Sequence, residues 1–235
     1  MRALVIHPDP TELLGLVGQA LVAQGFELDS FVVVPMERFE TPDVSTEFPA
    51  LAGYDLVVVL GAPWGAWDDA RIGSWLGDLL DLLRSAHSVE LPILGICFGG
   101  QALARALGGT VAPGPTPEIG WYEIATDRPE LVSAGPWFQW HYDRLTPPPG
   151  STELARTDLA SQAFVIGRSL GLQFHPELDV AELQGWLAMG GHGEALEAGF
   201  DPGELSAATE AQMAAATTRT ETLIAAFLQD VAGLR

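Results

Sequence analysis

The amino-acid sequence predicts an α/β fold: a mostly parallel central sheet with helices on both faces, a small antiparallel strand layer, and C-terminal helices. Two observations predict this class. In the first half of the 235-residue chain, short apolar runs alternate with segments whose apolar residues recur at helical spacing. In the second half, short strand-like runs follow one another with turns between them, and the chain ends in an Ala-rich segment.

The first half supplies the parallel part of the expected sheet. β-branched and aliphatic runs indicate buried strands, and apolar stripes indicate the helices between them. The expected strands are residues 2–6, 31–34, 56–60 and 93–96, and the expected helices are residues 11–24, 69–85 and 101–107. Because parallel strands place their carboxyl ends at one edge of a sheet, the segments after residues 60 and 96 should meet there.

The second half adds the antiparallel layer and the C-terminal helices. The expected strands are residues 120–126, 152–157, 163–167 and 170–174, with a rigid proline loop at 147–150 and a helix over 180–189 before a glycine-rich break at 190–193. An apolar stripe from Leu223 to Val231 ends the last helix. We expect that helix to dock on its own domain, with partner binding as the alternative. The whole chain, 1–235, should form one domain with a helical extension at 178–235.

Composition limits the classes of protein to consider. The chain is 48% apolar and long enough for one sizeable core, and no uncharged apolar stretch reaches the length of a membrane span. It begins directly with a strand-like run, without a basic leader or cleavage site. One cysteine leaves no intrachain disulfide, which agrees with a reducing compartment. We therefore expect a cytoplasmic protein with no membrane contact.

Charge argues against nucleic acid and nucleotides as ligands. The chain has 31 acidic residues against 11 arginines and no lysine, for a formal charge of −20. Such a field repels phosphate backbones, and the absence of lysine removes both a phosphate-binding lysine and a Schiff-base nucleophile. No Gly-x-Gly-x-x-Gly follows the first strand. The sequence predicts no cofactor and no metal.

The only cysteine, Cys97, lies in the run Pro-Ile-Leu-Gly-Ile-Cys-Phe-Gly-Gly-Gln at residues 92–101. Glycines on either side of Cys97 permit the sharp turn between a strand and a helix that lifts a nucleophile off the top of a sheet. There the thiol faces the positive end of a helix, which favours the thiolate, and the Phe98 backbone N–H faces a developing oxyanion. A buried cysteine that acts as a small apolar residue is the alternative.

A second motif, Leu-Gln-Phe-His-Pro-Glu at residues 172–177, contains His175 and Glu177. The preceding alternation of apolar residues predicts a strand, and Pro176 is expected to keep the chain extended. On an extended chain, residues two apart share a face, so the two side chains should project together. A carboxylate beside an imidazole fixes its tautomer and stabilises the imidazolium that forms when it takes a thiol proton.

These two motifs, together with the Trp-His-Tyr-Asp-Arg-Leu segment at residues 140–145, resemble the class I (triad) glutamine amidotransferases. The resemblance is strongest to stand-alone relatives of the amidotransferase domain of GMP synthetase and runs from about residue 2 to residue 177. It implies a flavodoxin-like sheet. It also implies that Cys97 is the nucleophile, His175 the general base and acid, and Glu177 the residue that orients His175.

The resemblance implies further site residues. The loop at residues 61–64 matches the family's oxyanion loop, so the backbone N–H groups of Ala62 and Phe98 are expected to hold the oxyanion. The expected substrate contacts are Trp64, Gln101, Trp140, Tyr142 and Asp143. Two positions depart from the family pattern: Gly100 stands where many relatives have His, and Ala62 where a second Gly is usual.

By this resemblance, the protein hydrolyses the side-chain amide of L-glutamine through a glutamyl thioester on Cys97. The released ammonia would pass to a separate synthetase, because the chain has no ATP-binding motif. One alternative is a hydrolase of γ-glutamyl amines or peptides. Another is a non-catalytic regulatory protein on the same fold, against which the complete set of Cys97, His175 and Glu177 argues.

Overall fold

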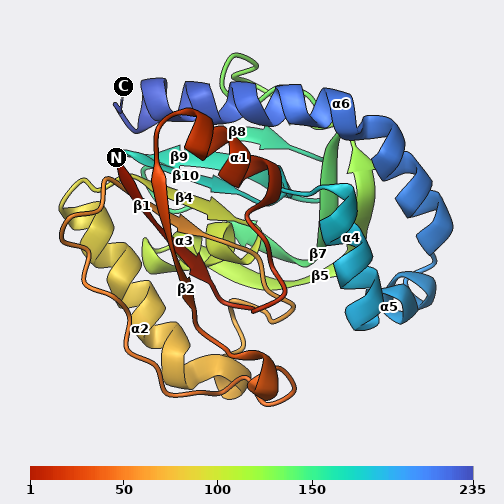
Figure 1. Cartoon of the computed structure of the whole chain (residues 1–235), viewed down its shortest axis with the longest axis horizontal. Helices are drawn as coiled ribbons and strands as arrows, with labels where there is room; N and C mark the ends of the chain where they lie inside the picture. The colour runs from red at the N-terminus through yellow and green to blue at the C-terminus, as the bar shows by residue number, and fades with distance from the viewer. Residues whose placement is uncertain (235) are drawn as a thin grey trace.

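Eight strands form one sheet at the centre of the computed structural model, which describes residues 1–234 (Figure 1). In spatial order they are β2 (Glu27–Val32), β1 (Arg2–His7), β3 (Leu56–Val59), β4 (Ile93–Ile96), β10 (Ser169–Leu172), β9 (Ser161–Ile166), β8 (Thr152–Arg156) and β6 (Ala125–Thr126). The run from β2 to β10 is parallel, and β9, β8 and β6 continue the sheet with antiparallel pairing. The expected α/β class and its central sheet are confirmed.

Helices cover both faces of the sheet because its central strands are apolar on both sides. Along β1, Ala3 and Val5 face one core and Leu4 and Ile6 the other, as the two-residue period of a strand requires. The first core is covered by α1 (Gly15–Ala23) and α6 (Pro202–Ala226), and the second by α2 (Asp69–Ser88) and α3 (Phe98–Ala106). Figure 1 shows α6 and α2 on opposite sides of the sheet.

The C-terminal helix docks on its own domain, as expected. Leu223 and Ile224 of α6, with Phe227 and Leu228 of the π-helical turn η3 (Phe227–Val231), are buried in the first core. No helix within residues 1–234 has the length and apolarity needed to cross a membrane.

A separate antiparallel ribbon forms the smaller layer. It pairs β5 (Thr110–Tyr122) with β7 (Trp137–Thr146). Three short helical segments pack beside it, namely α4 (Val180–Trp186), η2 (Leu187–Gly191) and α5 (His192–Glu197). Ile119 and Phe138 of the ribbon bury their side chains against Leu183 and Ala195 of these segments. The C-terminal segments therefore form a wall beside the carboxyl edge of the main sheet (Figure 1).

Several expected boundaries are wrong. The expected strand at 120–126 is two strands in different sheets, since β5 ends at Tyr122 and β6 covers only Ala125–Thr126. No strand was expected at β7, because it buries polar residues such as Gln139 and His141 and so lacks the alternation of an ordinary half-buried strand.

The second and last parallel strands also differ from the expectation. β2 covers Glu27–Val32 and not 31–34, because an edge strand paired only with β1 tolerates polar residues that hide its signal. β10 ends at Leu172, and the chain turns before His175. A short 3-10 helix, η1 (Met36–Arg38), lies in the segment after β2.

Helix α3 lies directly on the backbones of two strands. A Cβ on Gly99 would stand 2.0 Å from the carbonyl oxygen of Val59 in β3, and one on Gly100 would stand 2.3 Å from that of Leu172 in β10. Any side chain at either position would push the helix off the sheet. Gly100 therefore suits this packing.

We predict that Gly100→Ala lowers the free energy of unfolding by about 1–3 kcal/mol, because the added methyl group overpacks a backbone contact. Chemical denaturation would measure the change. The matched control is Gly77→Ala in α2, where a Cβ would meet no atom within 4 Å. That control should raise the stability by about 0.5–1 kcal/mol, as alanine does in a helix. Equal effects of the two substitutions would contradict the close packing of α3.

Candidate active site

Cys97 occupies a strained turn between β4 and α3. Its φ of 49° and ψ of −108° lie outside the regions that non-glycine residues favour. Such a conformation costs on the order of 1–3 kcal/mol and persists only where the surroundings impose it. Here the Cys97 N–H donates to the Leu172 carbonyl at 2.9 Å, and the Gly99 N–H donates to the Leu60 carbonyl at 3.1 Å. The sharp turn expected at this position is present.

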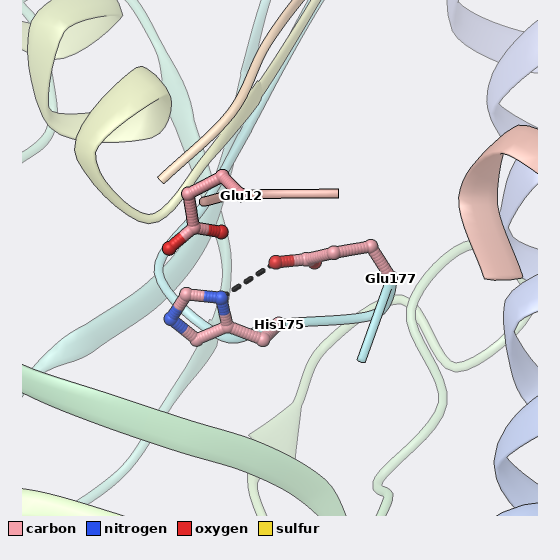
Figure 2. A group of neighbouring side chains, drawn as sticks. All are labelled: Glu12, His175 and Glu177. Carbon is pink, nitrogen blue, oxygen red and sulfur yellow. Dashed lines mark hydrogen bonds and ion pairs between the residues drawn. The ribbon is translucent and has the colours of Figure 1, made fainter. Parts of the chain in front are cut away.

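His175 and Glu177 follow the carboxyl end of β10, and their side chains form a pair. His175 Nδ1 lies 2.6 Å from Glu177 Oε1, and both side chains are buried (Figure 2). The expected extended chain is wrong here, because Pro176 and Glu177 form a turn. The turn is held from three sides: His175 N–H donates to the Phe138 carbonyl, the Glu177 carbonyl accepts from Leu16 N–H, and the Thr220 hydroxyl donates to the Pro176 carbonyl.

The surroundings of His175 favour its charged form. Burial lowers the pKa of the imidazole, but Cys97 and Glu177 outweigh it and raise that pKa well above its ordinary value. The indole of Trp186, on α4, contacts the ring edge-on with centroids 4.9 Å apart. Among residues 1–234, Nε2 of His175 is buried and has no hydrogen-bond partner. Glu177 and Trp186 thus hold the ring, its charged form is favoured, and Nε2 is the nitrogen that remains for proton transfer.

A further carboxyl group lies against this pair, which the sequence did not indicate. Donor atoms of Glu12, His175 and Glu177 all lie within 4.8 Å of one another (Figure 2). Burial, followed by the charge of Glu182, raises the pKa of Glu12 well above its ordinary value, with His175 opposing. Burial and Glu177 raise the pKa of Glu182 to about 9. The surroundings therefore favour the protonated forms of Glu12 and Glu182.

These three donors are of the kinds that bind divalent cations. His175 Nδ1, however, is already hydrogen-bonded to Glu177, and its pKa favours the protonated ring, which does not bind metals. The arrangement suits proton transfer better than metal binding. The expected absence of a metal remains a prediction.

The loop at residues 61–64 is separated from the end of β3 by Leu60 alone and lies beside the turn at Cys97. Phe98 is the first residue of α3, so its backbone N–H has no hydrogen-bond partner within the helix. Ala62 is not among the described non-glycine residues with positive φ, which are Glu90 and Cys97. Alanine in place of a second glycine therefore causes no left-handed strain in this loop. Ala62 lines the same cavity as Cys97.

One cavity of about 450 Å³ brings most of the expected site residues together. Its lining includes these residues named from the sequence: Ala62, Trp64, Cys97, Gln101, Trp140, Tyr142, Asp143 and His175. Phe98 and Glu177 do not line it; they lie behind Cys97 and His175. The segments beyond residue 185 contribute Trp186, Met189, Gly191 and Glu194 to the lining, which the sequence did not indicate.

The residues expected to contact the substrate differ in the hydrogen bonds and packing contacts that their side chains already make. Gln101 is buried, and its Nε2 donates to Gln173 Oε1 at 3.2 Å. Gln173 in turn lies with Nε2 3.7 Å from Cys97 Sγ, which the sequence did not indicate. Asp143 accepts a hydrogen bond from Trp67 Nε1 at 2.9 Å. Trp64 is buried edge-on against Trp75 and serves chiefly as a wall.

The mouth of the cavity is mostly acidic. The lining residues Asp68, Asp143 and Glu194 are at least partly exposed, as is the basic Arg71, whereas the lining residue Asp9 is buried. Burial, followed by the charge of Glu194, raises the pKa of Tyr142 to about 12, so its hydroxyl stays protonated. A ligand with a positively charged group suits this mouth.

The sequence comparisons agree with this geometry. The family model for class-I glutamine amidotransferase matches residues 16–185. A glutamine-hydrolyzing GMP synthase of Aeropyrum pernix is 35% identical over 157 residues, which make up 61% of this chain and 28% of that protein. The glutamine amidotransferase-like protein chyE of Penicillium rubens is 32% identical over 192 residues, 73% of this chain and 74% of that one. The chain spans less than a third of the Aeropyrum protein.

Solved structures share the fold over the whole chain. A glutamine amidotransferase from Thermotoga maritima superposes with a TM-score of 0.83 at 27% identity and covers 98% of this chain and 99% of that one. A glutamine amido transferase from Methylobacillus flagellatus superposes with a TM-score of 0.84 at 24% identity, over 100% and 95% of the two chains, which shows the common fold. With its family model matched over most of its length, this chain belongs to the class I glutamine amidotransferases, as a relative of the amidotransferase parts of GMP synthases.

Proposed function

We propose that the protein hydrolyses the side-chain amide of L-glutamine through a thioester on Cys97. The observation that carries the proposal is the buried His175–Glu177 pair, at 2.6 Å, beside a cysteine held in a strained turn at the wall of one cavity. A general base, an orienting carboxylate and a nucleophile are the parts that acyl transfer requires.

The proposed reaction proceeds in two halves. The Cys97 sulfur attacks the amide carbon, and the N–H groups of Ala62 and Phe98 hold the resulting oxyanion. His175, charged by the proton it took from the thiol, gives that proton to the departing nitrogen; the C–N bond breaks and ammonia leaves. His175 then takes a proton from water, the hydroxide attacks the thioester, the C–S bond breaks, and glutamate leaves with the thiol restored.

Ammonia acceptance by a second protein is also part of the proposal. One relative is a subunit of the glutamine-hydrolyzing GMP synthase of Sulfurisphaera tokodaii, 28% identical over 152 residues that cover 60% of this chain and 76% of that one. Such a subunit works with another chain, so we propose a separate synthetase as acceptor. We also propose that residues 1–235 act as one domain whose 178–235 extension completes the substrate pocket, since Trp186 and Glu194 line the cavity.

The hydrolysis of larger γ-glutamyl amines is the second candidate. The cavity of about 450 Å³ lies within the roughly 300–1,000 Å³ typical of pockets for drug-sized ligands, so an amine larger than ammonia has room. The acidic mouth favours an amine with a positive charge. Steady-state kinetics on glutamine and on a panel of γ-glutamyl amines distinguish the two candidates. We expect glutamine to be the better substrate; a far higher kcat/KM on the amines would replace the first candidate with the second.

Cys97→Ala should abolish ammonia release from glutamine, because no other cysteine exists to form the thioester. The coupled measurement is a glutamate and ammonia assay on the purified variant, with circular dichroism to verify its fold. The parent protein should also be labelled at Cys97 by a glutamine-analogue chloroketone, seen by mass spectrometry. Ammonia release by a folded Cys97→Ala variant at the parent's rate would disprove the mechanism.

Glu177→Gln should lower kcat by up to about 10⁴-fold, since an amide neither fixes the tautomer of His175 nor stabilises its charged form. Labelling of Cys97 by the chloroketone should stay detectable, because the nucleophile is unchanged. Glu153→Gln, an exposed substitution on β8, is the matched control and should keep the parent's kcat. A Glu177→Gln variant as fast as the parent would mean that another group orients the imidazole.

A further inference from the structure

Glu12, a buried acid outside the triad, lies between the two parts of the site that carry the proposed chemistry. It is 7% exposed and belongs to the segment between β1 and α1. A Cβ on Gly61, at the start of the oxyanion loop, would stand 3.2 Å from the carboxyl carbon and from both carboxyl oxygens of Glu12. On its other side, Figure 2 shows the Glu12 and Glu177 carboxyl groups both directed toward the His175 ring.

The burial of the Glu12 side chain is not explained by an ion pair or hydrogen bonds that would stabilise the fold. A buried carboxylate kept for stability is normally paired with a cation or several N–H groups. Glu12 Oε2 has no hydrogen-bond partner among residues 1–234. The titratable groups that face it are Glu182 from α4, His175 and Glu177 after β10, and Asp9 in its own segment. Burial and the three acids together disfavour a negative charge on Glu12 more strongly than His175 favours it.

The backbone around Glu12 is held on both sides. The Glu12 carbonyl lies 2.8 Å from His7 Nδ1, and the Leu13 N–H donates to Glu182 Oε1 at 2.8 Å. These contacts hold the backbone from which the Glu12 side chain extends, and so limit where its carboxyl group can lie. Besides Glu177 at Nδ1 and Trp186 against the ring, the Glu12 carboxyl is a third group beside the imidazole, with an oxygen within 4.8 Å of a ring nitrogen.

We propose that Glu12 is a positioning residue that acts through His175 and Gly61: its carboxyl group fills the space between the imidazole and the oxyanion loop and keeps both in place. The catalytic part of this proposal rests on the proposed function. Burial, first of all, raises the pKa of Glu12, which favours the neutral acid in this position. It therefore adds polar contact without adding negative charge beside the developing oxyanion.

Alkylation of Cys97 by iodoacetamide tests the proposal without any substrate. Cys97 is the only cysteine, so the rate reports on one thiol. In Glu12→Ala the imidazole gains freedom to turn away, so alkylation at neutral pH should slow and its pH midpoint should move upward, toward that of a free thiol. Glu12→Gln keeps the shape and the neutral charge and should keep the parent's profile. Glu27→Gln, on the edge strand β2, is the matched control and should also leave the profile unchanged.

Glutamine hydrolysis supplies the second readout. Glu12→Ala should lower kcat by up to about 100-fold, the cost of a misplacement of about 1 Å, with KM near the parent's value, because the displaced groups act on the transition state. Glu12→Gln should retain most of kcat. A loss in Glu12→Gln as large as in Glu12→Ala would overturn the neutral-acid role. A folded Glu12→Ala variant with the parent's alkylation profile and kcat would overturn the positioning role.

Folding is verified by near-UV circular dichroism and thermal melting. If Glu12→Ala does not fold, Glu12→Asp, which is one methylene shorter, takes its place with the same expected direction. The two proposals fail in different ways. If the parent itself releases no ammonia from glutamine, the proposed function fails, and the alkylation profiles still decide the role of Glu12.

Discussion

The close approach of helix α3 to the backbones of β3 and β10 is the constraint on which the site depends. The space between Gly99 and the Val59 carbonyl is too small for a side chain, and so is the space between Gly100 and the Leu172 carbonyl. This contact forces the chain to leave β4 abruptly, and Cys97 takes up the resulting strain with its positive φ. The same helix start leaves the Phe98 N–H without an intrahelical partner. The positions of the proposed nucleophile and of the proposed oxyanion donor thus follow from one packing contact.

Charge around the imidazole is balanced by the protonation of its neighbours. Three carboxyl groups, on Glu12, Glu177 and Glu182, lie in a buried region around one histidine. If all three were ionised, their mutual repulsion would exceed what one imidazolium offsets in a medium of low dielectric constant. Burial instead raises the pKa values of Glu12 and Glu182 and so favours their neutral forms, and Glu177 forms the hydrogen bond to His175. The positive charge that the proposed proton transfer needs is thereby retained on the ring.

Much of the pocket wall comes from parts of the chain outside the two motifs. β7 contributes Trp140, Tyr142 and Asp143, and the segments after residue 185 contribute Trp186 and Glu194. The family model ends at residue 185, so the latter wall lies beyond the part that matches it. Variation in this wall would change the selectivity of the pocket without altering the pair of His175 and Glu177, in keeping with function residing in sites carried on a shared fold.

The sequence by itself determined the parts of this protein that depend on neighbouring residues. The turn at Cys97, the pairing of His175 with Glu177 and most of the strands and helices of the first half follow from local spacing and glycine placement. Even the wrong expectation of an extended His-Pro-Glu segment led to the right pair, because the two side chains are only two residues apart. Only the tertiary structure decided the positions of Glu12, Gln173 and Trp186 beside His175 and Cys97, and the existence of β7. These depend on contacts between segments far apart in the chain, and their polar or buried character carries no periodic signal from which a single sequence could indicate them.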